Sequence, residues 1–195
     1  MVENKDGSTG GHIHRTTTYV EMLARELKKR GLCSDELTED YIKNLVMAAP
    51  MHDIGKIAIP DAILQKPGKL TAEEYEVMKT HSAKGGEIIE GTFKTIGDDE
   101  YSRIAYQVAR YHHERWNGRG YPDGLMRKEI PLSARIMAVA DVFDAVSAKR
   151  CYRDAMPLEK CFEIIENGSG KDFDPVIAEV FLDMRDEIAA IVNNQ

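Results

Sequence analysis

Two adjacent pairs of polar side chains are the clearest candidates for chemistry in this sequence. His112 is followed directly by His113, and His52 is followed by Asp53. The chain has six histidines, so half of them fall in these two pairs. Imidazole and carboxylate groups are costly to bury without partners, whereas a site for more than one metal ion needs several of them together. The two pairs therefore favour metal-assisted hydrolysis.

Nitrogen and oxygen ligands for such a site occur along most of the chain. Seven groups exceed what one ion binds, and a shared carboxylate would suit two ions about 3.5–4 Å apart. The set contains no sulfur, which favours iron or manganese and leaves nickel and zinc open. Any single histidine of the set, taken alone, would more often be a helix cap or a surface residue. The candidates are His12, His52, Asp53, His81, His112, His113 and Asp141.

Two carboxylates in an apolar segment give the strongest physical argument for a metal. Asp141 lies within residues 136–146, where an unpaired carboxylate is expensive. Asp144 follows one turn later, on the same face of a helix. Two buried carboxylates one turn apart need cations nearby. His14 provides the contrast, because on a helix it points about 200° away from His12, and we predict that it is exposed and binds nothing.

Three cations could meet an anionic ligand. Lys56 lies one turn after His52, where it could contact a phosphate, orient Asp53, or remain solvated. Arg150 and Arg153 follow the helix that carries the two carboxylates, at i, i+3 spacing. They could bind a phosphate in bidentate fashion. As cations near a helix C-terminus they could equally stabilise the helix dipole.

The elements that must position these residues are predicted to be helices. Apolar residues repeat at helical spacing over 12–30, 40–49, 71–90, 98–113, 131–149, 157–166 and 175–192. Proline and glycine mark connectors at 61–70 and 117–129, and only 57–59 alternates weakly like a strand. We predict one all-α domain over residues 12–195, with the metal site between its central helices. Residues 1–11 are interpreted as a linker or a truncated segment.

The composition limits the possible functions. A chain of 195 residues with 43% hydrophobic and 30% charged residues is typical of one soluble globular domain. The net charge of −7 argues against binding a nucleic acid polymer or a membrane surface, although local cations can still capture a small anion. The three cysteines are scattered, the N-terminus is polar, and no apolar run reaches about 18 residues. We therefore predict a cytoplasmic protein without a membrane segment.

The motifs together resemble the HD-GYP family, a branch of the HD phosphohydrolase superfamily. The resemblance extends over most of residues 9–181, and this set of motifs in this order is far more specific than the His-Asp pair alone. The matching stretches are 11–16, 52–57, 59–64, 66–71, 78–81, 112–122, 130–136, 140–145 and 173–175.

The resemblance implies an all-helical domain that hydrolyses cyclic di-GMP with a cluster of two or three metal ions. Attack by a hydroxide that bridges the metals would give linear pGpG, with further cleavage to GMP left open. The seven candidate ligands match the family's ligand positions, and Asp53 would bridge two ions. Asp53 and Lys56 are therefore the predicted catalytic residues. Lys56, Asp144, Arg150 and Arg153 match positions that face the substrate.

The departures from the family concern the metal count and one loop. Some members support a third metal with a Glu four residues before the first ligand, where this chain has Ser8, so we expect two ions. The loop of Gly120-Tyr121-Pro122 is associated in the family with partners that include GGDEF domains. Asn117 and Arg127-Lys128 depart from the usual residues of this loop, which affects its conformation or its partners. Whether the chain forms a homodimer is left open.

Two alternative functions remain at this stage. The enzyme could act on another substrate, such as cyclic GMP-AMP or a nucleotide monoester, because no guanine-reading residue is visible. The domain could instead be a weak or silent module that binds a cyclic dinucleotide or a protein partner. The complete ligand set argues against a silent module, because silent members commonly lose ligands. Metal analysis combined with a turnover assay would separate these alternatives.

Overall fold

The computed structural model describes residues 11–93, 99–148 and 156–193. These residues form helices joined by loops and contain no strand, which confirms the all-α prediction. Gly11, which the sequence assigned to the linker, begins the first described helix. The elements are α2 (Gly11–Lys29), α3 (Glu39–Ala48), η1 (Ala49–Met51), η2 (Ile54–Ala58), α4 (Asp61–Leu64), α5 (Ala72–Phe93), α6 (Glu100–Tyr111), η3 (Arg127–Glu129), α7 (Leu132–Ser147), α8 (Leu158–Gly168), α9 (Pro175–Asp183) and α10 (Arg185–Asn193).

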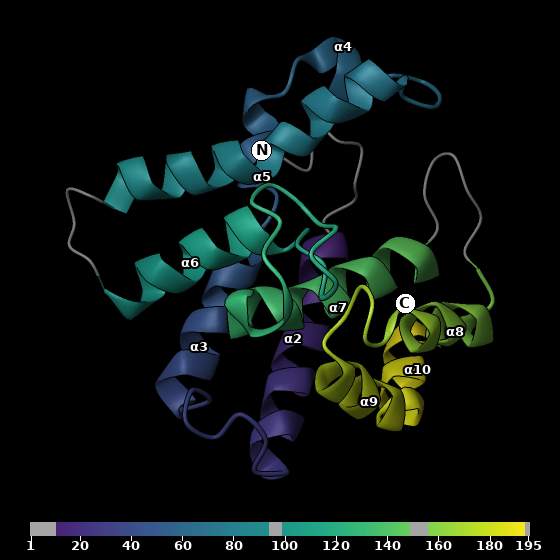
Figure 1. The fold of residues 1–195 in the computed structure, drawn as a ribbon. Helices are drawn as coiled ribbons and strands as arrows, with labels where there is room; N and C mark the ends of the chain where they lie inside the picture. Colours follow the sequence, from purple (N-terminus) through teal and green to yellow (C-terminus); the bar gives the residue numbers. More distant parts are fainter. Residues whose placement is uncertain (1–10, 94–98, 149–155, 194–195) are drawn as a thin grey trace.

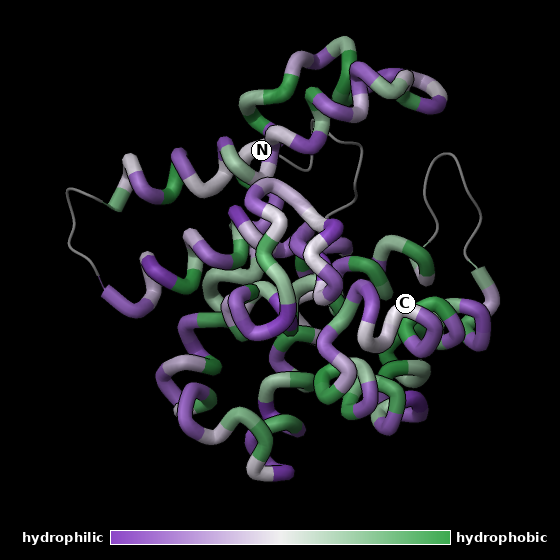
Figure 2. Tube along the Cα trace, viewed as in Figure 1, coloured by the Kyte–Doolittle hydropathy of each residue, from purple (hydrophilic) through white to green (hydrophobic). Residues whose placement is uncertain are grey.

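Helix α7 lies at the centre of the fold (Figure 1) and packs against α2, α6, α8 and α9. Every residue from Leu132 to Ala140 is buried, because small and aliphatic side chains let neighbouring helices approach from all sides. Tyr19 of α2 and Phe181 of α9 contact Phe143 of α7, with ring centroids 5.5 and 5.0 Å away. In Figure 2 hydrophobic and hydrophilic residues alternate along the surrounding helices, as expected for helices with one buried face.

Helices α5 and α6 run side by side next to this core (Figure 1), and η2 packs against α5. Gly55 of η2 makes this approach possible, because a Cβ atom there would lie 1.8 Å from the backbone oxygen of His81. The N-terminus of α6 is closed by a capping box, in which Asp99 accepts from the backbone of Ser102 and the Ser102 hydroxyl accepts from the backbone of Asp99. Both features fix the helices that carry the histidines.

The structure differs from the predicted elements at several places, one of which is the short helix α4 within the connector predicted over 61–70. The chain turns from α3 through two short 3₁₀ helices, and His52 and Asp53 lie at the junction between η1 and η2 rather than on one continuous helix. The predicted helix over 175–192 is divided into α9 and α10, with the mostly buried Met184 between them. Among the described residues, no helix combines the length and the apolar character needed to cross a bilayer.

Candidate metal centre

Five separate segments bring the predicted ligands together. His12 lies in the first turn of α2, His81 in the middle of α5, and Asp141 in α7. The two adjacent pairs come from loops, one between η1 and η2 and the other directly after α6. Two clusters result, and within each cluster the ligand atoms lie within 4.8 Å of one another. Cluster A contains His12, His52 and Asp53, and cluster B contains His81, His112 and His113.

Cluster A is completed by Asp141. The Nε2 atoms of His12 and His52 are 3.4 Å apart, and His52 Nε2 is 3.3 Å from Asp53 Oδ2. Asp141 Oδ1 lies 3.9 Å from His12 Nε2 and 3.8 Å from His52 Nε2. Ligand atoms that share one ion at about 2.1 Å are about 3.0–3.4 Å apart. These four side chains therefore fit around a single cation after small adjustments.

Cluster B also brings imidazole nitrogens close to an oxygen of Asp53, on the other side of that carboxylate. The Nε2 atoms of His81 and His112 are 3.4 Å apart. Asp53 Oδ1 lies 3.5 Å from His81 Nε2 and 4.0 Å from His112 Nε2. The ring of His113 is next to both histidines, with centroid distances of 5.0 Å to His81 and 4.0 Å to His112. Three imidazoles and one carboxylate oxygen thus surround a second position.

Asp53 lies between the clusters and offers one carboxylate oxygen to each. Burial opposes the ionisation of this carboxyl, but the charges of Lys56 and His52 outweigh it and hold its pKa well below the usual range. Lys56 Nζ lies 2.8 Å from Asp53 Oδ2. An ionised carboxylate shared in this way is suited to bridging two cations.

The electrostatics of the histidines match a site built for cations. Burial lowers the pKa of His52, but Asp53 and Asp141 more than compensate and raise it to about 9. The pKa values of His112 and His113 are held well below the ordinary value by burial and by neighbouring imidazoles. Neutral imidazole is the form that binds metal. In cluster A the carboxylates of Asp53 and Asp141 favour a positive charge on His52, and the same two carboxylates would favour a bound cation.

Hydrogen bonds at Nδ1 aim the histidines at the clusters. His52 donates to the carbonyl oxygen of Ala49 at 2.9 Å, His81 to that of Met78 at 2.8 Å, and His112 to that of Val108 at 2.9 Å. Since a carbonyl oxygen can only accept, each ring carries a proton on Nδ1, and its Nε2 atom can bind a metal whenever the ring is neutral.

Asp144, which the resemblance places toward the substrate, lies behind His12 in this structure. Its side chain is completely buried, and Oδ2 lies 2.6 Å from Nδ1 of His12. Arg15 donates to both carboxylate oxygens from Nε and Nη2. Asp144 therefore contacts the side of the His12 ring that faces away from cluster A, and both of its carboxylate oxygens have partners. Asp141, expected to be buried, keeps 16% of its side-chain surface exposed.

Of the remaining predicted residues, the structure describes His14 and Lys56. His14 is exposed on α2, as predicted from its helical position. Lys56 is partly buried beside Asp53, which agrees with an orienting role and leaves a phosphate contact untested. Arg150, Arg153 and Ser8 lie outside the described residues.

The Gly120-Tyr121-Pro122 loop folds back onto cluster B. The ring of Tyr121 packs on His113 with a centroid distance of 4.8 Å, and its backbone N–H donates to the carbonyl oxygen of His113. The buried carboxylate of Glu114 accepts from the backbone N–H groups of Asp123 and Gly124. The loop is therefore anchored to the residue that follows the two histidines.

Sequence reasoning missed two side chains at this edge of the site. Lys79 Nζ lies 5.7 Å from the ring centroid of Tyr75 and 5.6 Å from that of Tyr121. Tyr75 remains 50% exposed. They lie one turn apart on α5 and approach the centre through Tyr121, whose ring packs on His113. Nothing in their spacing distinguishes them from an ordinary solvated helix face.

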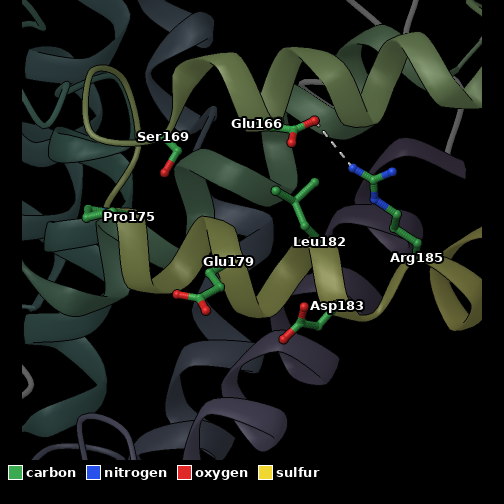
Figure 3. Close-up of a pocket in the computed structure, with 7 residues that line it drawn as sticks. All are labelled: Glu166, Ser169, Pro175, Glu179, Leu182, Asp183 and Arg185. Carbon is green, nitrogen blue, oxygen red and sulfur yellow. Dashed lines mark ion pairs between the residues drawn. The ribbon is translucent and has the colours of Figure 1, made fainter.

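A concave region lies between α8, α9 and α10 and shares no residue with the metal centre. It is an open pocket of about 520 Å³ (Figure 3). Its charged residues are mostly acidic, and Arg185 lies 3.6 Å from Glu166 across it. It contains no histidine.

Comparisons with known proteins agree with this geometry. The family model described as "HD domain" matches residues 1–177. A cyclic di-GMP phosphodiesterase of Vibrio cholerae is 44% identical over 98% of this chain and 39% of its own length. A 3′3′-cGAMP-specific phosphodiesterase of the same organism is 42% identical over 97% of this chain and 34% of its own length. A cyclic di-GMP phosphodiesterase of Thermotoga maritima is 40% identical over the whole chain and half of its own length.

Among solved structures, a cyclic GMP-AMP-specific phosphodiesterase of V. cholerae has the same fold. Its TM-score is 0.68 at 19% identity, covering 98% of this chain and 48% of that protein. The chain spans between about a third and a half of these relatives. The matched model, the motifs and the cluster geometry agree, and the chain belongs to the HD domain family, with motifs that resemble those of its HD-GYP branch.

Proposed function

We propose that this domain is a metal-dependent phosphodiesterase that hydrolyses a cyclic dinucleotide, with cyclic di-GMP as the expected substrate. The observation that carries the proposal is the position of Asp53, which offers one carboxylate oxygen to each of two ligand clusters. Phosphodiester hydrolysis at two neighbouring cations is the chemistry to which such a centre is suited.

The residues present fit two divalent ions. His12, His52, Asp53 and Asp141 would hold one ion, and Asp53, His81, His112 and His113 would hold the other. Four protein ligands for each ion leave coordination positions for water and substrate. Such ions polarise a phosphoryl oxygen and lower the pKa of water. We propose iron or manganese, because the ligands are imidazole and carboxylate only.

The chain's own residues complete the site. Lys56 neutralises part of the charge of Asp53 and is close enough to the centre to stabilise charge on a phosphoryl oxygen. Arg150 and Arg153 follow the end of α7, and the proposal that they bind the second phosphate of a dinucleotide rests on their sequence position. Asp144 is not proposed as a substrate contact.

We propose that a base binds next to the loop that packs on cluster B. Tyr75 has an exposed ring, and Lys79 lies between that ring and Tyr121. We infer that a purine stacks on Tyr75 while Lys79 attracts the adjoining phosphate, because aromatic rings and cations bind nucleotides through stacking and charge. Tyr75→Ala should raise KM while Tyr75→Phe should not. Met47→Ala, another exposed apolar side chain on a different helix, serves as the control.

The proposed partner surface is the outer part of the loop that carries Gly120-Tyr121-Pro122. Tyr121 packs inward on His113, whereas Arg119 and Met126 are exposed and available to a second protein. Binding of a GGDEF domain here stays a proposal, and a pull-down with Met126→Glu would test it.

The identity of the substrate is the main question for experiment. Relatives with cyclic di-GMP and with 3′3′-cGAMP in their names match this chain at 44% and 42% identity, so similarity alone does not choose between them. Purified protein loaded with Fe²⁺ or Mn²⁺ should be assayed against both by chromatography of the products. We expect a higher kcat/KM for cyclic di-GMP and no turnover by Asp53→Ala. Full metal content with no turnover of either would support the silent binding module instead.

A further inference from the structure

We propose that Asp144 and Arg15 are positioning residues that hold the His12 ring for metal binding at cluster A. They do this from behind the ring, without contacting substrate. The inference rests on the proposed metal-dependent function. It assigns to Asp144 a role different from the one its sequence position suggested.

His12 differs from the other aimed histidines in the partner of its Nδ1 atom. His52, His81 and His112 donate to carbonyl oxygens three or four residues earlier in the chain, so each ring is fixed by its own segment. His12 is the second residue of α2, and the described helix has no carbonyl one turn before it. Its Nδ1 atom instead meets Asp144 Oδ2 from α7. The orientation of this ligand therefore depends on how α2 packs against α7.

Arg15 completes the arrangement by holding the carboxylate. Its Nε atom donates to Oδ1 of Asp144, and Nη2 donates to Oδ2 at 3.0 Å. Arg15 and His12 lie three residues apart on α2 and thus on the same face of the helix. The fork fixes the plane of the carboxylate, since two parallel N–H donors allow little rotation. The fixed carboxylate then fixes the His12 ring.

Burial supports a positioning role and opposes a substrate contact. The Asp144 side chain is 1% exposed and Arg15 is 15% exposed. Burial acts to raise the pKa of Asp144, but hydrogen bonds from His12 and Arg15 outweigh it and lower the pKa below the usual value. Both carboxylate oxygens are already occupied. A phosphate or ribose could reach this group only by displacing partners that a buried charge requires.

A carboxylate behind a metal-binding histidine also changes its strength as a ligand. It makes the imidazole more basic than a carbonyl partner does, and removal of such a partner typically weakens metal affinity about 10–100-fold. We therefore expect an asymmetric centre. The affinity of cluster A for its ion should depend on Asp144, whereas the affinity of cluster B should not.

The test is a titration of metal-free protein with Mn²⁺ alone, followed by electron paramagnetic resonance and calorimetry. Wild type should bind two ions. Asp144→Asn should bind the cluster A ion about 10–100-fold more weakly and the cluster B ion within about twofold of wild type. Arg15→Met should also weaken Mn²⁺ binding at cluster A, but by a smaller factor than Asp144→Asn. Arg15→Lys keeps the positive charge without the two parallel guanidinium donors, and it should restore part of the Mn²⁺ affinity that Arg15→Met loses.

Asp174→Asn is the matched control. Asp174 forms a buried ion pair with Arg135 of the same α7 helix at 2.6 Å, but neither residue contacts a ligand. This variant should lower the thermal midpoint and leave both Mn²⁺ affinities unchanged. Cobalt spectra of each variant would report the geometry of the ions independently of folding stability. Circular dichroism would identify a variant that fails to fold, in which case Arg15→Lys carries the test.

Three outcomes would overturn the inference. The first is an Asp144→Asn variant with unchanged Mn²⁺ affinities and a raised KM for the dinucleotide, which would make Asp144 a substrate contact. In the second, Asp174→Asn weakens metal binding as much as Asp144→Asn, so that the effect is general destabilisation. If wild type itself binds no divalent ion, the proposed function fails together with this inference, which distinguishes that result from the other two.

Discussion

Replacing Gly55 with alanine should disrupt the metal centre from a position that binds no metal. Gly55 lies in η2, which packs against α5, and an added Cβ atom would lie 1.8 Å from the backbone oxygen of His81 and 2.5 Å from the backbone nitrogen of Gly85. Ordinary contact begins near 3.4 Å. Because both neighbours are backbone atoms, no side chain can rotate away, and η2 must move from α5 by about 1.5 Å.

The movement of η2 away from α5 would separate Asp53 from His81, which belong to the two halves of the metal centre. Asp53 precedes η2 directly, whereas His81 is on α5, and Asp53 Oδ1 lies 3.5 Å from His81 Nε2. A misplacement of about 1 Å can cost about 100-fold in rate. Overpacking a core costs about 1–3 kcal/mol, and we expect the upper part of this range. For a domain of this size, about 3 kcal/mol corresponds to roughly 6–12 °C in thermal midpoint.

Gly85→Ala on the facing helix is the control, because its added Cβ atom would meet its nearest neighbours at 3.4 Å or more. Alanine in a helix interior should stabilise the chain by up to about 1 kcal/mol. Thermal midpoint, metal content and hydrolysis should be measured for both variants. A Gly55→Ala protein that keeps two ions and hydrolyses substrate within twofold of wild type would refute the reasoning that this close approach positions the centre.

Asp53→Ala should abolish both paired metal binding and hydrolysis, whereas His14→Ala should affect neither; elemental analysis and turnover measure this, and normal activity without the Asp53 carboxylate would contradict the ligand assignment. Replacing Arg150 and Arg153 together with alanine should raise KM for cyclic di-GMP at unchanged metal content, with each lost contact costing about 1.5–3 kcal/mol; loss of metal instead would make both arginines structural. Tyr75→Ala should raise KM about tenfold, which matches a stacking contribution of about 1–3 kcal/mol, and an unchanged KM in steady-state kinetics would remove the proposed base site.

The sequence by itself determined the class of fold and named the candidate ligands. Helical periodicity reflects which side of each segment is buried, and this is a local property that the chain displays directly. Seven imidazole and carboxylate side chains in a cysteine-poor chain limit the chemistry to a few metals, because few residue types can bind them. The exposure of His14 followed from helix geometry alone.

Tertiary packing decided how those ligands divide and what supports them. Asp53 serves both clusters because η2 lies against α5, and no local pattern states where a separate helix will pass. Asp144 lies 132 residues from His12, and only the packing of α7 on α2 brings them to 2.6 Å. Asp141 faces His12 and His52 of cluster A, whereas Asp144 lies behind the His12 ring, although both carboxylates are on one helix. Spacing along a helix shows which face a side chain occupies, but the neighbouring helix determines what that side chain meets.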